Sequence, residues 1–206
     1  MKTNLCKVFC FICLERVMIY MKYFKKLVGD RIYLSPRNPE DYEKFTEWLN
    51  DFETTDYLGR SGNMVSLDAE KEYLEKNSKE EASFAIVTLD SDKLIGTVSL
   101  EMINHINRCA TLGIFIGDKS YRSKGYGTEA IRMILEYGFK YLNLINIKLD
   151  LMSFNERALK CYKKCGFKEY GRIGGILWIR YIVDQHRVME QQKRKRMKKI
   201  ELETQL

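Results

Sequence analysis

The chain has 206 residues, enough for one full-sized domain, and carries a formal net charge of +7. With 45% hydrophobic residues and two prolines, its composition excludes a disordered, collagen-like or disulfide-framework protein. No apolar run reaches the roughly 18 residues of a membrane span. Residues 1–20 and 187–206 together hold six of the seven net positive charges. The middle of the chain is therefore almost neutral, which argues against a basic nucleic-acid groove across the fold.

The first twenty residues are interpreted as an N-terminal extension. Their short apolar stretch is at the lower limit for a secretory signal, and Glu15 and Arg16 stand where a cleavage site needs small residues. Three cysteines in this segment have C-x3-C-x2-C spacing, which is typical of iron–sulfur sites in radical enzymes or arises by chance. We expect neither a signal peptide nor a cluster, and the native start is predicted near Met21.

The C-terminal segment 191-QQKRKRMKKIELETQL-206 is strongly basic. It predicts a solvated, partly helical tail, and the alternative is contact with RNA, the ribosome or another acidic surface. The run has no aromatic residue on which a base could stack. Under this alternative, contact with nucleic acid or the ribosome would be made through the tail alone. The cysteines outside the N-terminal extension indicate reduced thiols in a cytoplasmic protein.

Between these ends, residues 21–190 are predicted to form one α+β domain. A strand over 30–34 is followed by a helix that opens at Pro39, since proline and acidic residues favour a first helical turn. A second helix is expected over 66–77, with Ser66 as its N-cap. The strands that follow are predicted over 83–89, 94–102, 109–116 and 146–152, with 90-DSDK-93 as a hairpin turn.

The last third of this domain shows two amphipathic helices and two short strands. The helix over 127–142 has apolar residues along one side. The helix over 155–165 ends before Gly166, a residue that suits the left-handed position after a helix. Closing strands are predicted over 168–173 and 178–189.

The segment 122-RSKGYG-127 is a glycine-rich turn between a strand and a helix. Its glycines let the backbone turn sharply, and the first helical N–H groups lack partners within the helix. Together they form a cradle for phosphate or pyrophosphate, with Arg122 and Lys124 adding charge beside it. Alone, R-x-x-G-x-G is equally compatible with a simple strand-to-helix turn. It is neither a P-loop nor a dinucleotide fingerprint.

A second motif follows at 155-NERALKCYKKCGF-167, and with it the sequence resembles the GNAT N-acetyltransferases. It looks most like the ribosomal-protein-alanine N-acetyltransferase subgroup, which 47-EWLND-51 also resembles. The resemblance spans about 28–190 and is strongest over 107–130 and 155–167. It implies a mixed, mostly antiparallel central sheet, flanked by helices and splayed at the acetyl-CoA site. The implied activity is acetyl transfer from acetyl-CoA to a primary amine, without a metal.

The resemblance also assigns roles to individual residues. In the family, the turn amides hold the CoA diphosphate, the preceding strand lines the acetyl-pantetheine arm, and Asn155 bonds the pantetheine or substrate side. Tyr162 matches the tyrosine that protonates the departing CoA thiolate, although a packed aromatic is the alternative. The implied cofactor-binding residues are Ile114, Phe115, Ile116, Arg122, Ser123, Lys124, Gly125, Tyr126, Gly127, Thr128 and Asn155.

The general base and the acceptor remain open at this point. Asp150 is the first candidate base because an acid is unusual inside a strand, and an equal alternative is a solvent-facing pair with a lysine. Glu101 and His105 are second choices. Thr111 stands where the subgroup often has an acid, and 173-IGGI-176 replaces charged residues found in many relatives. Both departures leave the substrate undecided.

Direct attack of the amine on the thioester is expected, without a covalent enzyme intermediate. The acceptor could be a protein N-terminus, a polyamine or an aminoglycoside, and the carboxylates of 51-DFETTD-56 with Glu47 would suit a polyamine. The alternative class is a non-catalytic CoA-binding or ribosome-associated module that uses the basic tail. A monomer or a homodimer is compatible with the sequence.

Overall fold

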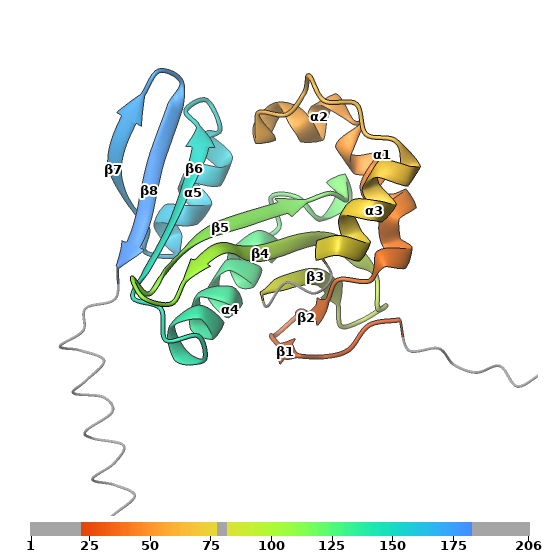
Figure 1. Cartoon of the computed structure of the whole chain (residues 1–206), viewed down its shortest axis with the longest axis horizontal. Helices are drawn as coiled ribbons and strands as arrows, with labels where there is room; N and C mark the ends of the chain where they lie inside the picture. The colour runs from red at the N-terminus through yellow and green to blue at the C-terminus, as the bar shows by residue number, and fades with distance from the viewer. Residues whose placement is uncertain (1–21, 78–81, 183–206) are drawn as a thin grey trace, which may run out of the picture.

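The computed structural model describes residues 22–77 and 82–182 (Figure 1). The predictions for residues 1–20 and for the tail 191–206 lie outside these ranges. The described chain forms a sheet with strand order β1-β2-β3-β4-β5-β6-β8-β7. Its strands are β1 (Leu27–Val28), β2 (Ile32–Pro36), β3 (Ser83–Thr88), β4 (Leu94–Asn104), β5 (Cys109–Ile116), β6 (Asn146–Met152), β7 (Lys168–Ile173) and β8 (Ile176–Ile182).

Helices cover both faces of this sheet (Figure 1). They are η1 (Pro39–Asp41), α1 (Tyr42–Leu49), α2 (Phe52–Thr55), η2 (Asp56–Leu58), α3 (Leu67–Asn77), η3 (Lys119–Tyr121), α4 (Tyr126–Lys140) and α5 (Glu156–Lys164). The alternation of side chains along each strand separates two cores. One core joins the sheet to α4 and α5 and contains Ile32, Ile86 and Ile134. The other lies under α1 and α3 and contains Tyr33 and Val87.

The sheet is splayed between β5 and β6. These strands pair in parallel over three positions, from Cys109 opposite Asn146 to Thr111 opposite Lys148. Beyond Thr111, β5 runs on beside β4, whereas β6 pairs along its whole length with β8. The two strands therefore diverge and open the sheet toward the end of β5 (Figure 1). This arrangement confirms the predicted mixed, splayed sheet flanked by helices.

Most predicted elements are present with small changes in their bounds. The strands over 109–116, 146–152 and 168–173 match the prediction at both ends. The Ser66 hydroxyl oxygen accepts a bond from the Ala69 N–H as the predicted N-cap, and Gly166 has a φ of +96° after α5. Within the described residues, no helix is long and apolar enough to cross a membrane.

Two parts of the fold differ from the sequence prediction. The strand predicted over 30–34 begins at Ile32 and is buried from there through Ser35, because helices cover both of its faces. The short helices α2 and η2 were not predicted, since 51-DFETTD-56 carries no apolar periodicity. They lie beside the opening between β5 and β6, where they shape the site.

Candidate active site

A cavity of about 1000 Å³ passes through the opening between β5 and β6. Because side chains alternate along each strand, the residues that line the cavity belong to both faces of the sheet. We call the part next to α4 and α5 the α4 side, and Ile114 and Ile116 of β5 belong to it. The part under α1 and α3 is the α3 side, and it includes Ser99, Glu101 and Gly113. A ligand in this cavity can therefore contact both faces of the sheet.

The glycine-rich turn lies at the α4 side, at the start of α4. Ser123 and Gly125 have φ values of +59° and +89°, and Gly125 is the N-cap of the helix. Ser123, Gly125, Gly127 and Thr128 line the cavity. The first amides of α4 have no partners within the helix and carry its positive dipole end. The turn therefore offers an anion-binding backbone of the predicted kind.

Arg31 holds this turn in place. Its Nη1 donates to the Lys124 carbonyl oxygen at 3.0 Å, and its guanidinium lies 4.4 Å from the centre of the Tyr126 ring. Its Nε lies 3.1 Å from the Glu129 carboxylate on α4. Sequence reasoning missed Arg31, because 98 residues separate it from Glu129 and no local pattern connects them.

Three predicted cofactor residues have roles that differ from simple ligand contact. Arg122 donates from Nε to the Ile116 carbonyl oxygen at 2.9 Å and from Nη2 to the Thr54 hydroxyl oxygen at 2.6 Å. Its side chain is 9% exposed, so this guanidinium joins the end of β5 to α2. Lys124 and Tyr126 stand outside the cavity lining. The turn thus contributes backbone groups more than side-chain charge.

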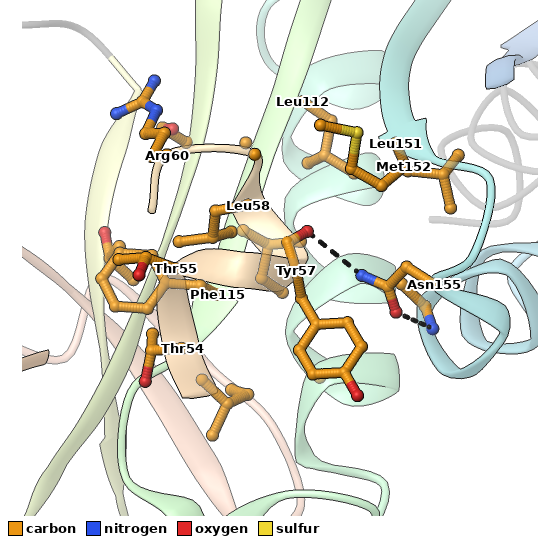
Figure 2. Close-up of a pocket in the computed structure, with 18 of the residues that line it drawn as sticks. Thr54, Thr55, Tyr57, Leu58, Arg60, Leu112, Phe115, Leu151, Met152 and Asn155 are labelled. Atoms are coloured by element: carbon orange, nitrogen blue, oxygen red, sulfur yellow. Dashed lines mark hydrogen bonds between the residues drawn. The ribbon is translucent and has the colours of Figure 1, made fainter. Parts of the chain in front are cut away.

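Asn155 links the start of α5 to η2. Its Oδ1 accepts from the Ala158 N–H at 3.1 Å and caps α5, while its Nδ2 donates to the Tyr57 carbonyl oxygen at 3.3 Å. Arg157 lies 5.1 Å from the centre of the Tyr57 ring. Figure 2 shows η2 held in this way between β5 and the beginning of α5. Asn155 therefore fixes the wall of the cavity in addition to lining it.

Tyr162 on α5 lines the cavity and is 7% exposed. Its ring packs against Phe167 at 5.7 Å between centroids. Burial raises the pKa of Tyr162, and Cys161, Cys165 and Asp150 add to the increase. The phenol is therefore protonated at neutral pH and has a proton to donate.

Cys161, beside Tyr162 in the chain, also lines the cavity. Its Sγ lies 3.1 Å from the Thr128 hydroxyl oxygen. The neighbouring Cys165 lowers the pKa of Cys161 below its ordinary value, and Thr128, Lys164 and Arg132 contribute to the decrease. The thiolate form of Cys161 is therefore favoured on the α4 side.

Both carboxylates proposed as bases belong to the α3 side. Glu101 accepts a bond at Oε1 from the Ser99 hydroxyl at 2.8 Å. A Cβ on Gly113 would lie 3.0 Å from the same Oε1, so the carboxylate lies directly against β5. Asp150 lines the cavity from β6, where Ile147 and Leu149 on the alternating face are buried. His105 lies in the turn after β4, outside the cavity lining.

The acidic segment 51–56 does not provide the open carboxylate cluster considered for a polyamine. Lys119 lies 3.2 Å from Asp51 and 2.8 Å from Glu53. Asp56 accepts a bond from the Ser61 hydroxyl. Glu47 pairs with Lys44 at 2.7 Å. These charges are satisfied by neighbouring side chains, and of the four acids Glu53 alone lines the cavity.

Sequence reasoning missed Glu70, a carboxylate of α3 that lines the cavity and is 5% exposed. Burial raises its pKa from 4.5 to about 6, against the opposing attraction of Arg37 and Arg60. One signal was present in the sequence: Glu70 stands four residues before Leu74, which puts both on one helix face. Since Leu74 is buried, its acidic neighbour had to face inward as well.

Comparisons with known proteins agree with this geometry. Residues 31–168 match the acetyltransferase (GNAT) domain family. A probable N-acetyltransferase of Bacillus subtilis is 32% identical over 174 residues, which cover 79% of this chain and 94% of the relative. Spermidine N(1)-acetyltransferase of Escherichia coli is 38% identical over 88 residues, which cover 43% of this chain and 46% of that enzyme.

Among solved structures, spermidine N-acetyltransferase of Vibrio cholerae, in complex with CoA and spermine, superposes with a TM-score of 0.65. It is 27% identical, and the match covers 75% of this chain and 96% of that one. These relatives do not support the specific likeness to ribosomal-protein-alanine acetyltransferases. The family match over most of the described domain, the B. subtilis relative and the splayed sheet lead to one conclusion: the chain belongs to the GNAT family of N-acetyltransferases.

Proposed function

We propose that this protein transfers the acetyl group of acetyl-CoA to a primary amine by direct attack in a ternary complex. The observation that carries this proposal is the continuous cavity through the splayed sheet, with an anion-binding turn on the α4 side and carboxylates on the α3 side. Such a cavity lets a thioester and an amine approach from opposite faces. Holding both reactants in one geometry supplies much of the rate enhancement in such a transfer.

The α4 side suits the cofactor. A Cβ on Gly125 would lie 3.2 Å from Arg31 Nη2, and its φ of +89° favours glycine, so the conformation of the turn depends on a residue without a side chain there. The amides of 125–128 would hold the diphosphate, and the pantetheine arm would follow Ile114 and Ile116 through the opening. The free polar edge of β5 beyond Thr111 offers backbone groups for that arm and for a developing oxyanion.

The proton transfers require one base and one acid. The amine nitrogen attacks the thioester carbon, its proton passes to Asp150 or Glu101, directly or through water, and the carbon–sulfur bond breaks. Tyr162 donates a proton to the departing thiolate, a role that suits its protonated phenol. Asp150→Asn and Glu101→Gln distinguish the two bases, because loss of the true base lowers kcat roughly 10²- to 10⁴-fold.

The names of the spermidine acetyltransferases among the relatives favour a small amine over a protein N-terminus. The test is release of CoA thiol from acetyl-CoA in the presence of butylamine, putrescine, spermidine, an aminoglycoside and an N-terminal peptide. We expect turnover with the small amines, together with thermal stabilisation of the protein by acetyl-CoA. Absence of both turnover and stabilisation would contradict the proposal.

A further inference from the structure

Glu70 is a buried carboxylate that faces the α3 side of the cavity. It is 5% exposed, and among the described residues no hydrogen bond or ion pair reaches its carboxylate. Buried ionised groups are ordinarily paired, because removing a charge from water is costly. An unpaired carboxylate on a cavity wall is therefore a position at which a cationic ligand gains both charge attraction and hydrogen bonds.

The charged groups around Glu70 leave this position open. Arg37, which follows β2, donates from Nε to the Thr97 hydroxyl oxygen at 2.9 Å, and Arg60 follows η2. Both arginines act on Glu70 through longer-range attraction, which is weaker than the effect of burial. The pKa of Glu70 is about 6, so the carboxylate is ionised at pH 7 without a contacting cation.

The neighbouring wall contains a second polar atom without a partner. The Thr111 hydroxyl oxygen is buried and makes no hydrogen bond within the described residues, and Thr111 lines the cavity. It stands opposite Glu101 in the pairing of β4 with β5, at the point where β5 leaves β6. The α3 side therefore has two separate polar positions, one beside the opening and one at Glu70.

We propose that Glu70 binds a second, non-reacting ammonium group of the acceptor, so that the substrate is a diamine or longer polyamine. This inference rests on the proposed function, in which the reacting amine lies at the opening near Glu101 and Asp150. A single charge-assisted contact at Glu70 then selects acceptors by their second positive charge. The carboxylates of segment 51–56 do not perform this selection, because Lys119 and Ser61 already occupy them.

The test uses an amine that binds but cannot be acetylated. Tetramethylated butane diamine and dimethylbutylamine are titrated into the protein, and their Kd values are compared for wild type, Glu70→Gln and Glu72→Gln. Glu72 is the matched control because it is an exposed acid on the same helix. Loss of a hydrogen-bonded charge should raise the diamine Kd about 10- to 100-fold in Glu70→Gln, with the monoamine Kd unchanged.

Equal affinity of the wild-type protein for the diamine and the monoamine would overturn the inference. So would a Glu70→Gln protein that binds the diamine as tightly as wild type. If Glu70→Gln does not fold, Glu70→Asp gives the same readout, since a shortened carboxylate should weaken the diamine and spare the monoamine. Acetylation assays separate the two proposals. Equal kcat/KM values for butylamine and putrescine would contradict the role of Glu70 but leave the proposed function intact. Diamine binding without any turnover would contradict the proposed function but leave the role of Glu70 in binding intact.

Discussion

The α4 side and the α3 side of the cavity are built in different ways. The α4 side comes mainly from one stretch of chain, in which β5, the turn at 122–127 and α4 follow one another, with α5 added beside them. The α3 side collects single side chains from α3, β4, β5, β6 and the loop after η2. One side presents backbone groups set by local conformation, and the other presents side chains set by packing. A cofactor site shared by a family suits the first kind of construction, and a variable acceptor site suits the second.

Gly125→Glu should break the α4 side most strongly. Gly125 has a φ of +89°, and a carboxylate there would repel the diphosphate as well as strain the turn. We expect acetyl-CoA affinity measured by calorimetry to fall about 100-fold or more, by charge repulsion and lost amide contacts together. Gly174→Glu is the matched control, because Gly174 has a φ of +55° with open space around it. Equal acetyl-CoA affinities in the two variants would contradict this assignment.

Tyr162→Phe tests the proposed proton donor on α5. Removing the hydroxyl takes away the proposed proton donor and leaves the ring packed against Phe167. We expect kcat at saturating acetyl-CoA to fall roughly 10- to 1000-fold, with a small change in the KM for acetyl-CoA. Tyr137→Phe on α4 provides a control at a tyrosine that is partly buried against the same core. An unchanged kcat in Tyr162→Phe would remove Tyr162 from the mechanism.

Alkylation of Cys161 measures access to the α4 side. Cys165, Thr128, Lys164 and Arg132 lower the pKa of Cys161, so more of this thiol is ionised at neutral pH than of an ordinary cysteine. Iodoacetamide should therefore modify Cys161 about tenfold faster than Cys109 at pH 7, as followed by peptide mass spectrometry. Acetyl-CoA should slow the reaction at Cys161 and spare Cys109, which lies on β5 at the closed end of the opening. Modification of Cys161 at the same rate with and without acetyl-CoA would place the cofactor elsewhere.

Glu70→Gln should have a smaller effect than the preceding changes. It should weaken diamine binding but raise the free energy of unfolding. Burial raises the pKa of Glu70 to about 6, above its ordinary 4.5, so the folded protein holds the proton more tightly than the unfolded chain does. The ionised carboxylate therefore destabilises the fold above pH 6, and this cost disappears as the pH falls below 4.5.

The glutamine variant should consequently be more stable than wild type at pH 7, by up to about 2 kcal/mol. This advantage should vanish near pH 4, as followed by urea unfolding. A loss of stability at pH 7 would instead indicate that Glu70 is a structural partner of Arg37 and Arg60.

The difference between the two sides also explains what the sequence alone could predict. The bounds of β5 and β6, the turn with Gly125 and the end of α5 at Gly166 follow from short-range patterns of alternation, glycine and helix capping. Local sequence did not predict where charged side chains point. Arg122 stands beside the phosphate-type turn, yet its guanidinium is directed to Ile116 and Thr54, a contact that spans 68 residues in the latter case.

The α3 side could not be predicted from local sequence, because contacts between distant segments determine which of its carboxylates are paired or buried. The acids of 51–56 formed a plausible cationic site by composition, and Lys119, more than 60 residues away, pairs with two of them. Glu70 belongs to a helix with six charged residues among eleven, a pattern typical of a solvated surface. Its burial is decided by the packing of α3 on α1 and over the sheet, and its spacing to Leu74 is the one local feature that points to it.

The division of the cavity is tested most directly by a crystal structure of the protein with CoA and tetramethylated butane diamine bound together. Our account predicts the CoA diphosphate within hydrogen-bond distance of the amides of 125–128. It also predicts the diamine on the opposite face of the sheet, with one ammonium group in contact with the Glu70 carboxylate. CoA under α1 and α3, or a diamine bound without contact to Glu70, would contradict it.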